Sequence, residues 1–374
     1  MFDRMKALLD GYLQMGVPGY DVMVCRGGEC VLRMQGGYAD RDAGIPMRGG
    51  ERFNFYSCSK PVTVTAVMLL VEQGRIALDD PLSAYLPEFA QMSVRTPEGD
   101  RPAKTPITLR HLFSMQAGFD YDVHTPALER AREATGGLAP LREVVRFLAQ
   151  QPLAFEPGTR YGYSLGHDVL AAVAEVVTGE RYEDYVRRVI FDPLGMKDST
   201  FLLPPQERAA LAAQYRFNPA AGRAEDCGRG NEFLFGPAYA SGGAGLVSTT
   251  EDYMRFLEAL RTGALFARPD TLALMLTDQL SPSSRAVYGF NKHHGYGLGM
   301  RCPYPGLPAT DFGWDGAAGA FAAVDPSRDA CLIYVQHVLD SPQSAERFAI
   351  LDALAADLDG LGGLSPQSLP TRLG

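Results

Sequence analysis

The chain has 374 residues, of which 46% are hydrophobic and 21% are charged. This composition allows a large buried core in one or two domains and excludes a disordered or fibrous protein. The formal net charge of −9 disfavours binding to nucleic acid or to an anionic membrane surface, because both carry negative charge. The composition leaves the oligomeric state open.

The N-terminus and the cysteines favour a cytoplasmic protein. Residues 1–10 place apolar side chains at positions 2, 5, 8 and 9, which predicts an amphipathic helix rather than a secretory leader. No segment approaches the roughly 18 uninterrupted apolar residues that a membrane span needs. The six cysteines form no Cys-x-x-Cys pair, so we expect reduced and mostly buried thiols.

Predicted strands lie at both ends of the chain, and predicted helices fill its middle. Residues 21–26 and 29–35 flank Gly27-Gly28 and predict a β-hairpin. A helix is expected over residues 62–73, where Gly74 ends it. Further helices are expected at residues 108–115, 127–134, 141–150, 169–178 and 182–190. The last third predicts a glycine-rich loop, a capped helix, two short strands and a closing helix, at residues 241–250, 250–262, 320–324, 331–337 and 344–358.

This order of elements predicts an α+β fold, in which both ends of the chain build one sheet around an inserted helical domain. We assign residues 1–80 and 236–360 to the sheet domain and residues 81–235 to the mainly helical domain. Residues 361–374 are expected to form a loose C-terminal tail.

Ser57 and Lys60 stand three residues apart at the start of the predicted helix. At this spacing the two side chains fall on one helix face, one turn apart. Burial and the positive end of the helix both lower the pKa of a lysine there, so that it can take the serine proton. Pro61 fits a first helical turn, where its missing N–H costs little. Without further support, a surface lysine on a capped helix is the favoured explanation of the pair.

Residues 53–63, Phe-Asn-Phe-Tyr-Ser-Cys-Ser-Lys-Pro-Val-Thr, resemble the first motif of serine β-lactamases, penicillin-binding proteins and related carboxylesterases. Further segments match in the family's order, at residues 107–112, 117–118, 157–165, 241–246 and 312–319. The ordered set is far more specific than any single motif. The resemblance implies the β-lactamase/transpeptidase-like fold, with an antiparallel sheet flanked by helices.

The resemblance also implies a set of site residues. Tyr163 matches the tyrosine of the family's second motif, and a neighbouring Lys60 cation is expected to favour its phenolate. Either residue can then be the base for Ser57. The backbone N–H groups of Ser57 and Ala317 are expected to form an oxyanion hole. Gly316 is expected to keep a strand edge open to substrate, whereas Trp314 fits a substrate contact and plain core packing equally well.

Two departures from the family pattern concern the substrate. Leu165 replaces an asparagine that β-lactamases use to hold an acylamide. Trp314-Asp315 replaces a cation or hydroxyl that grips a carboxylate, and Asp315 is expected to add a negative charge at this substrate edge. Both changes favour small uncharged esters, because an unpaired buried carboxylate is costly. The motif forms are most similar to those of family VIII carboxylesterases and of the acyltransferases related to them. A β-lactamase or D-alanyl-D-alanine peptidase activity is the alternative within the same fold.

Competing signals point to other classes of protein. Residues 162–166 spell Gly-x-Ser-x-Gly, the nucleophile elbow of α/β-hydrolases, with Ser164 as the candidate nucleophile, but a loop rather than a strand precedes them. His293-His294 has no partner spacing typical of a metal site, so we expect neither metal nor cofactor. A catalytically silent binding protein also remains open, although Ser57, Lys60 and Tyr163 are all present.

Overall fold

The computed structural model describes residues 2–289 and 293–360 of the chain. The predicted tail at residues 361–374 lies outside the described residues. None of the helices in the described part is long and apolar enough to cross a membrane.

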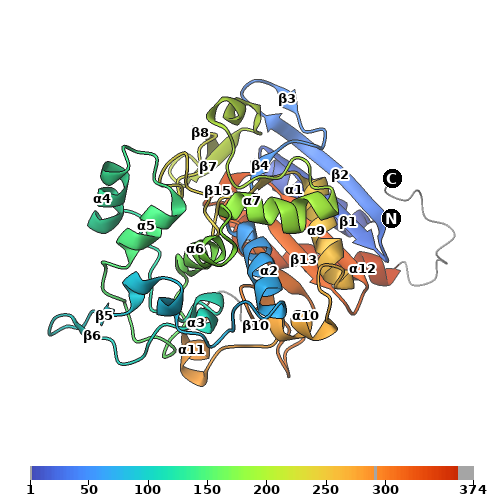
Figure 1. Cartoon of the computed structure of the whole chain (residues 1–374). Coiled ribbons are helices and arrows are strands. Elements are labelled where there is room, and N and C mark those ends of the chain that lie inside the picture. Colours follow the sequence, from blue (N-terminus) through green and yellow to red (C-terminus); the bar gives the residue numbers. More distant parts are fainter. Residues whose placement is uncertain (1, 290–292, 361–374) are drawn as a thin grey trace.

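An eight-stranded antiparallel sheet joins the two ends of the chain (Figure 1). Its strand order is β10-β11-β12-β13-β14-β1-β2-β3, so the N-terminal hairpin pairs directly with the C-terminal strand β14. This pairing has the form expected from strands at both ends of the sequence. The strands are β1 Gly19–Arg26, β2 Glu29–Asp40, β3 Ile45–Pro46, β10 Gly295–Tyr296, β11 Arg301–Cys302, β12 Phe312–Asp315, β13 Phe321–Asp325 and β14 Ala330–Val335.

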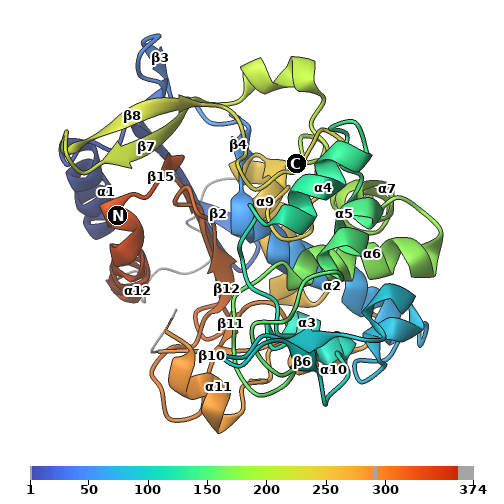
Figure 2. The same cartoon turned by 90° about the vertical axis from the view of Figure 1, so that its left-hand side faces the viewer.

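Helices cover both faces of this sheet, because the strands alternate apolar side chains between the two faces. Val22 and Val24 pack with the helices α1 (Asp3–Gln14) and α12 (Phe348–Gly360). Met23 and Cys25 face the other way and belong to the main core, together with α2 (Ser59–Glu72) and α9 (Thr250–Thr262). Figure 2 shows the resulting layers, with α1 and α12 on one side of the sheet and α2 and α9 on the other.

The middle of the chain supplies the remaining helices, as predicted. They are α3 Leu109–Phe113, α4 Pro126–Ala134, α5 Leu141–Leu148, α6 Gly166–Thr178, α7 Tyr182–Val186 and α8 Asp192–Leu194. Helices α10 (Pro269–Met275) and α11 (Pro282–Val287) follow later in the chain. One buried apolar cluster runs from the sheet through α2 into α3, α5 and α6, so the division into two domains stays a prediction.

Three smaller sheets were not expected from the sequence. Strand β4 (Phe53–Asn54) pairs with β9 (Val247–Ser248), and β5 (Ser93–Val94) pairs with β6 (Arg101–Pro102). Strands β15, β7 and β8 form a third sheet, from Val338–Leu339, Gln214–Asn218 and Arg223–Gly228. The β4–β9 pair matters for function, because it holds the backbone that leads into Ser57.

Candidate functional site

Ser57 lies in the short 3₁₀ turn Tyr56–Cys58, between strand β4 and helix α2. The Phe55 N–H donates to the Leu246 carbonyl at 2.9 Å, which fixes this segment beside the glycine-rich loop. Tyr56 has a φ of 47°, a left-handed conformation that costs a non-glycine residue free energy and is frequent at functional sites. The buried ring of Tyr56 and its hydrogen bond to Gln214 at 2.7 Å hold this conformation. Ser57 itself stays half-buried.

Lys60 lies one helical turn after Ser57, and its Nζ is 3.1 Å from Ser57 Oγ. The same Nζ donates to the Gly243 carbonyl at 2.8 Å, so the glycine-rich loop orients the amine. The side chain is completely buried, and this desolvation lowers the lysine pKa to about 7. A substantial fraction of Lys60 is therefore neutral near neutral pH and able to accept a proton.

Tyr163 approaches Ser57 from the other side, on the loop that precedes α6. Its hydroxyl lies 2.7 Å from Ser57 Oγ and accepts a hydrogen bond from Trp314 Nε1 at 3.2 Å. Burial raises the pKa of Tyr163 well above its usual range, although these two hydrogen bonds lower it. Lys60 was expected to favour a phenolate here, but desolvation has the largest effect on the Tyr163 pKa and favours the protonated hydroxyl. Ser57, Lys60 and Tyr163 nevertheless converge, as the sequence motifs predicted.

Tyr121 completes an aromatic wall that sequence reasoning missed. Its ring stacks on that of Tyr163 with centroids 5.3 Å apart, and Trp314 also stacks on Tyr163, at 5.9 Å. Lys60 Nζ lies 4.6 Å from the Tyr163 ring centroid and 5.3 Å from that of Tyr121, within cation–π range. No motif around Tyr121 marks it in the sequence, since its position depends on a loop of the helical region.

Asp168 is a second site residue that the sequence analysis did not single out. It is buried in the first turn of α6 and accepts hydrogen bonds from Ser241 Oγ at 2.6 Å and Tyr239 at 2.9 Å. A Cβ on Gly243 would lie 2.6 Å from Asp168 Oδ2 and 3.5 Å from Lys60 Nζ, so both groups abut the same glycine. Burial raises the pKa of Asp168, and the Lys60 charge opposes this rise. The signal in the sequence that could have indicated Asp168 is an acidic residue among the apolar residues of α6.

The structure separates the two residues that were expected to select the substrate on β12. Trp314 is buried against Tyr163, whereas Asp315 points to the opposite face of the strand, where Arg347 pairs with it at 2.8 Å. The negative charge expected at the substrate edge is therefore absent from that edge, because neighbouring side chains of a strand alternate in direction. Leu165 is also buried, at the cap of α6, as part of the main apolar core.

The turn after β12 brings Ala317 toward the backbone that carries Ser57. A Cβ on Gly316 would lie 2.4 Å from the Phe55 carbonyl oxygen, so only glycine permits this close approach. Gly316 donates its own N–H to Ala320 at 2.7 Å, which closes the turn. The backbone N–H groups of Ser57 and Ala317 have no hydrogen-bond acceptor among the residues that the structure describes. Both are available to a developing oxyanion.

The competing candidates do not form a second site. The Ser164 hydroxyl is buried against Met115 Sδ at 3.5 Å, and no strand precedes it. His167 Nε2 bonds the Phe113 carbonyl at 3.3 Å, and burial lowers the pKa of this histidine to about 3. Over residues 2–289 and 293–360, no three His, Cys, Asp or Glu side chains are grouped as metal ligands.

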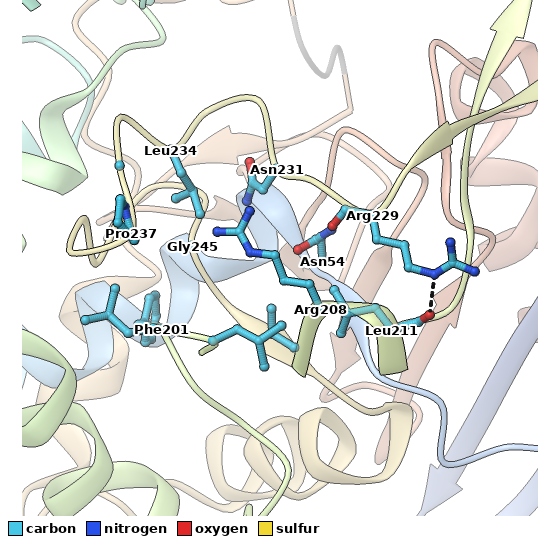
Figure 3. A pocket seen from close by; sticks show the side chains of 13 residues that line it. Asn54, Phe201, Arg208, Leu211, Arg229, Asn231, Leu234, Pro237 and Gly245 are labelled. Carbon is cyan, nitrogen blue, oxygen red and sulfur yellow. Dashed lines mark hydrogen bonds between the residues drawn. The ribbon is translucent and has the colours of Figure 1, made fainter. Parts of the chain in front are cut away.

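A small pocket of about 20 Å³ lies behind the glycine-rich loop rather than at Ser57 (Figure 3). Asn231 from this lining donates to the Ala244 carbonyl at 2.7 Å and so supports the loop whose Gly243 carbonyl holds Lys60. Arg229 turns away from the pocket and donates to Leu211 at 3.1 Å. Asn231, in the wall of this pocket, therefore supports the glycine-rich loop that holds Lys60.

The comparisons with known proteins identify the family. The family model described as Beta-lactamase matches residues 4–357. The chain belongs to the β-lactamase family. Esterase EstB of Burkholderia gladioli is 34% identical over 321 residues, which cover 79% of this chain and 78% of EstB. Lovastatin esterase of Penicillium rubens is 32% identical over 245 residues, covering 62% of this chain and 61% of that enzyme.

A solved structure is similar over almost the whole length of this β-lactamase family member. EstCE1, described as a hydrolase with promiscuous acyltransferase activity, has a TM-score of 0.77 and 29% identity, with 94% of this chain and 97% of EstCE1 covered. These matches confirm the predicted family and fold, and they show that the chain is a serine hydrolase.

Proposed function

We propose that the chain is a carboxylesterase that forms an acyl-enzyme on Ser57. The observation that carries this proposal is the position of Ser57 Oγ, 3.1 Å from Lys60 Nζ and 2.7 Å from the Tyr163 hydroxyl. A nucleophile between a group that can accept a proton and a group that can donate one is the arrangement that covalent acyl transfer needs.

The directions of the pKa shifts support one order of proton transfers within this arrangement. Neutral Lys60 accepts the proton of Ser57 as Oγ attacks the ester carbonyl, because burial lowers the pKa of Lys60 to about 7. Tyr163 stays protonated, because burial raises its pKa, and it donates toward Ser57 Oγ and the leaving alcohol. Its proton is replaced from the Lys60 ammonium, and water then releases the acyl group by the reverse path.

The N–H groups of Ser57 and Ala317 are proposed to bind the oxyanion of the tetrahedral intermediate. Both groups lack other acceptors in the described part of the chain, and the close contact of Gly316 with Phe55 holds the two segments together. Removal of one such donor typically costs about 3 kcal/mol of transition-state stabilisation.

The neighbours of Ser57 support an uncharged ester as the substrate. Tyr121, Tyr163 and Trp314 present aromatic rings, and the one cation among these neighbours, Lys60, is already held by Ser57 and Gly243. A substrate carboxylate would be desolvated there without a partner. The esterase names of EstB and lovastatin esterase agree with this choice.

A panel of substrates tests this assignment. We expect the purified protein to hydrolyse p-nitrophenyl acetate and butyrate at least about 100-fold faster, in kcat/KM, than nitrocefin or D-alanyl-D-alanine peptides, since a missing carboxylate partner costs a few kcal/mol. The absorbance of released p-nitrophenol or opened nitrocefin measures the rates. Efficient nitrocefin turnover with negligible ester hydrolysis would contradict the proposal.

Acyl transfer to an alcohol is a second activity of the same acyl-enzyme. The similarity to EstCE1, whose title states a promiscuous acyltransferase activity, favours it. An alcohol that stacks on the aromatic wall can take the place of water in the second step.

The free thiols of all six cysteines support the proposal that these reactions occur in a reducing compartment such as the cytoplasm.

The pH dependence of turnover is expected to report Lys60. Because neutral Lys60 is the base, kcat/KM should rise with pH through about 7 and then level off. The Asp168 charge raises the Lys60 pKa, so Asp168→Asn should move this rise toward lower pH. Steady-state rates measured from about pH 5 to about pH 9 give the shift. An unchanged profile would show that Asp168 is protonated in the native protein and carries no charge.

Tyr163→Phe is expected to lower kcat by about 10²- to 10³-fold while the protein stays folded, because the leaving alcohol loses its proton donor. Tyr161→Phe is the matched control: Tyr161 lies in the same loop, and its hydroxyl makes no hydrogen bond to any residue that the structure describes. Steady-state kinetics with p-nitrophenyl butyrate compares the two variants. Equal losses in both would assign Tyr163 a packing role.

A further inference from the structure

The β1–β2 hairpin places two cysteines opposite each other. Gly27 and Gly28, with φ of 60° and 84°, form the two-residue turn, and Arg26 pairs with Glu29 across it. Cys25 pairs with Cys30 in the next position. In a two-residue hairpin this next pair is not hydrogen-bonded, and its Cα atoms are about 4.5 Å apart, within the range that a disulfide spans.

The two thiols differ in exposure. Cys25 is completely buried under α9, whereas Cys30 is half-buried. Strand β3 pairs with β2 only at Tyr38 and Asp40, so within the described residues the outer edge of β2 has no strand partner at Cys30. Cys30 is therefore the more accessible of the two thiols.

The chemical environment favours Cys30 as the thiolate. A hydrogen bond from Cys25 lowers the pKa of Cys30, and the positive charge of Arg33 acts in the same direction, while burial opposes both. Beside a bulge in the pairing, the protonated Cys30 thiol donates a hydrogen bond to the Leu32 carbonyl at 3.5 Å. A partly exposed thiolate beside a second thiol is the arrangement that oxidises reversibly.

We propose that Cys25 and Cys30 form a modification site at which a hydroperoxide converts the two thiols into a disulfide. The Cys30 thiolate attacks the outer peroxide oxygen, which breaks the O–O bond, gives a sulfenic acid and releases the alcohol or water after protonation. The Cys25 sulfur then attacks the Cys30 sulfur, the S–O bond breaks, and water leaves with the Cys25 proton. The peroxide is reduced by two electrons that the thiols supply.

Peptide mass spectrometry tests the proposal on the full-length protein. After brief treatment with hydrogen peroxide, remaining thiols are alkylated and the chain is cut with trypsin, which cleaves after Arg26 and so separates the two cysteines. We expect one pair of peptides joined through Cys25 and Cys30, and its loss after dithiothreitol. Cys227, which is exposed but not paired with another cysteine in the sheet, serves as the internal control and should remain outside any intramolecular link.

Two variants separate the steps. Cys25→Ser should stop at a Cys30 sulfenic acid that dimedone traps, and Cys30→Ser should leave Cys25 reduced. Circular dichroism confirms that each variant is folded. The proposal is overturned if Cys30 reacts no faster than Cys227, or if Cys25 is found joined to Cys331, its partner on the other side of β1.

Discussion

Ser57→Ala is expected to abolish ester turnover, with a loss on the order of 10⁴-fold or more in kcat. The hydroxyl of Ser57 is the one that both Lys60 and Tyr163 contact, so its removal leaves no nucleophile in the site. The same variant should lose covalent labelling by a fluorophosphonate, which reacts with activated serines. Loss of labelling is the sharper measurement, because it does not depend on the choice of ester.

Ser164→Ala is the matched control for this experiment. Ser164 lies in a Gly-x-Ser-x-Gly sequence, but its hydroxyl is buried against Met115, so the variant should keep labelling and most of its turnover. A labelled Ser57→Ala protein together with an unlabelled Ser164→Ala protein would reverse the assignment. Intact mass spectrometry after labelling distinguishes the two outcomes.

The parts of the site that the sequence could predict are those held by local geometry. Ser57 and Lys60 meet because three residues of helix separate them, and this spacing holds in any helix. The place of Tyr163 in the site was predicted from the ordered set of family motifs and not from local geometry. The capped helix α9 begins at Thr250 after the Thr249 cap, as expected, since a cap is also a local interaction.

The parts that could not be predicted depend on tertiary contacts. Asp168 gains its role from loop residues such as Gly243, far away in sequence, and Tyr121 from stacking on Tyr163. Trp314 and Asp315 were assigned to the same surface from the family motif, although that motif was expected at a strand edge. Alternation along a strand places two neighbouring side chains on opposite faces. Strands as short as β10 and β11 exist through pairing with their neighbours rather than through their own propensity.

Lys60→Met is expected to lower kcat/KM by about 10²- to 10⁴-fold, the range that a general base contributes. Methionine keeps an unbranched apolar chain in this fully buried position, so the fold should survive, but nothing then accepts the Ser57 proton. The remaining rate should rise with pH without levelling off near 7, because hydroxide replaces the amine. Rates with p-nitrophenyl acetate as a function of pH measure both effects.

Lys104→Met provides the matched control for the Lys60 variant, because Lys104 is exposed and lies outside the site. Its turnover and pH profile should equal those of the parent.

The pH profile also distinguishes a catalytic role of Lys60 from a purely structural one. A lysine that only held Gly243 in place would lose activity on replacement, yet the parent protein would show no rise in kcat/KM through about pH 7. Lys60→Met activity within a few-fold of the parent, with the same pH profile, would exclude Lys60 as the base and transfer that role to Tyr163.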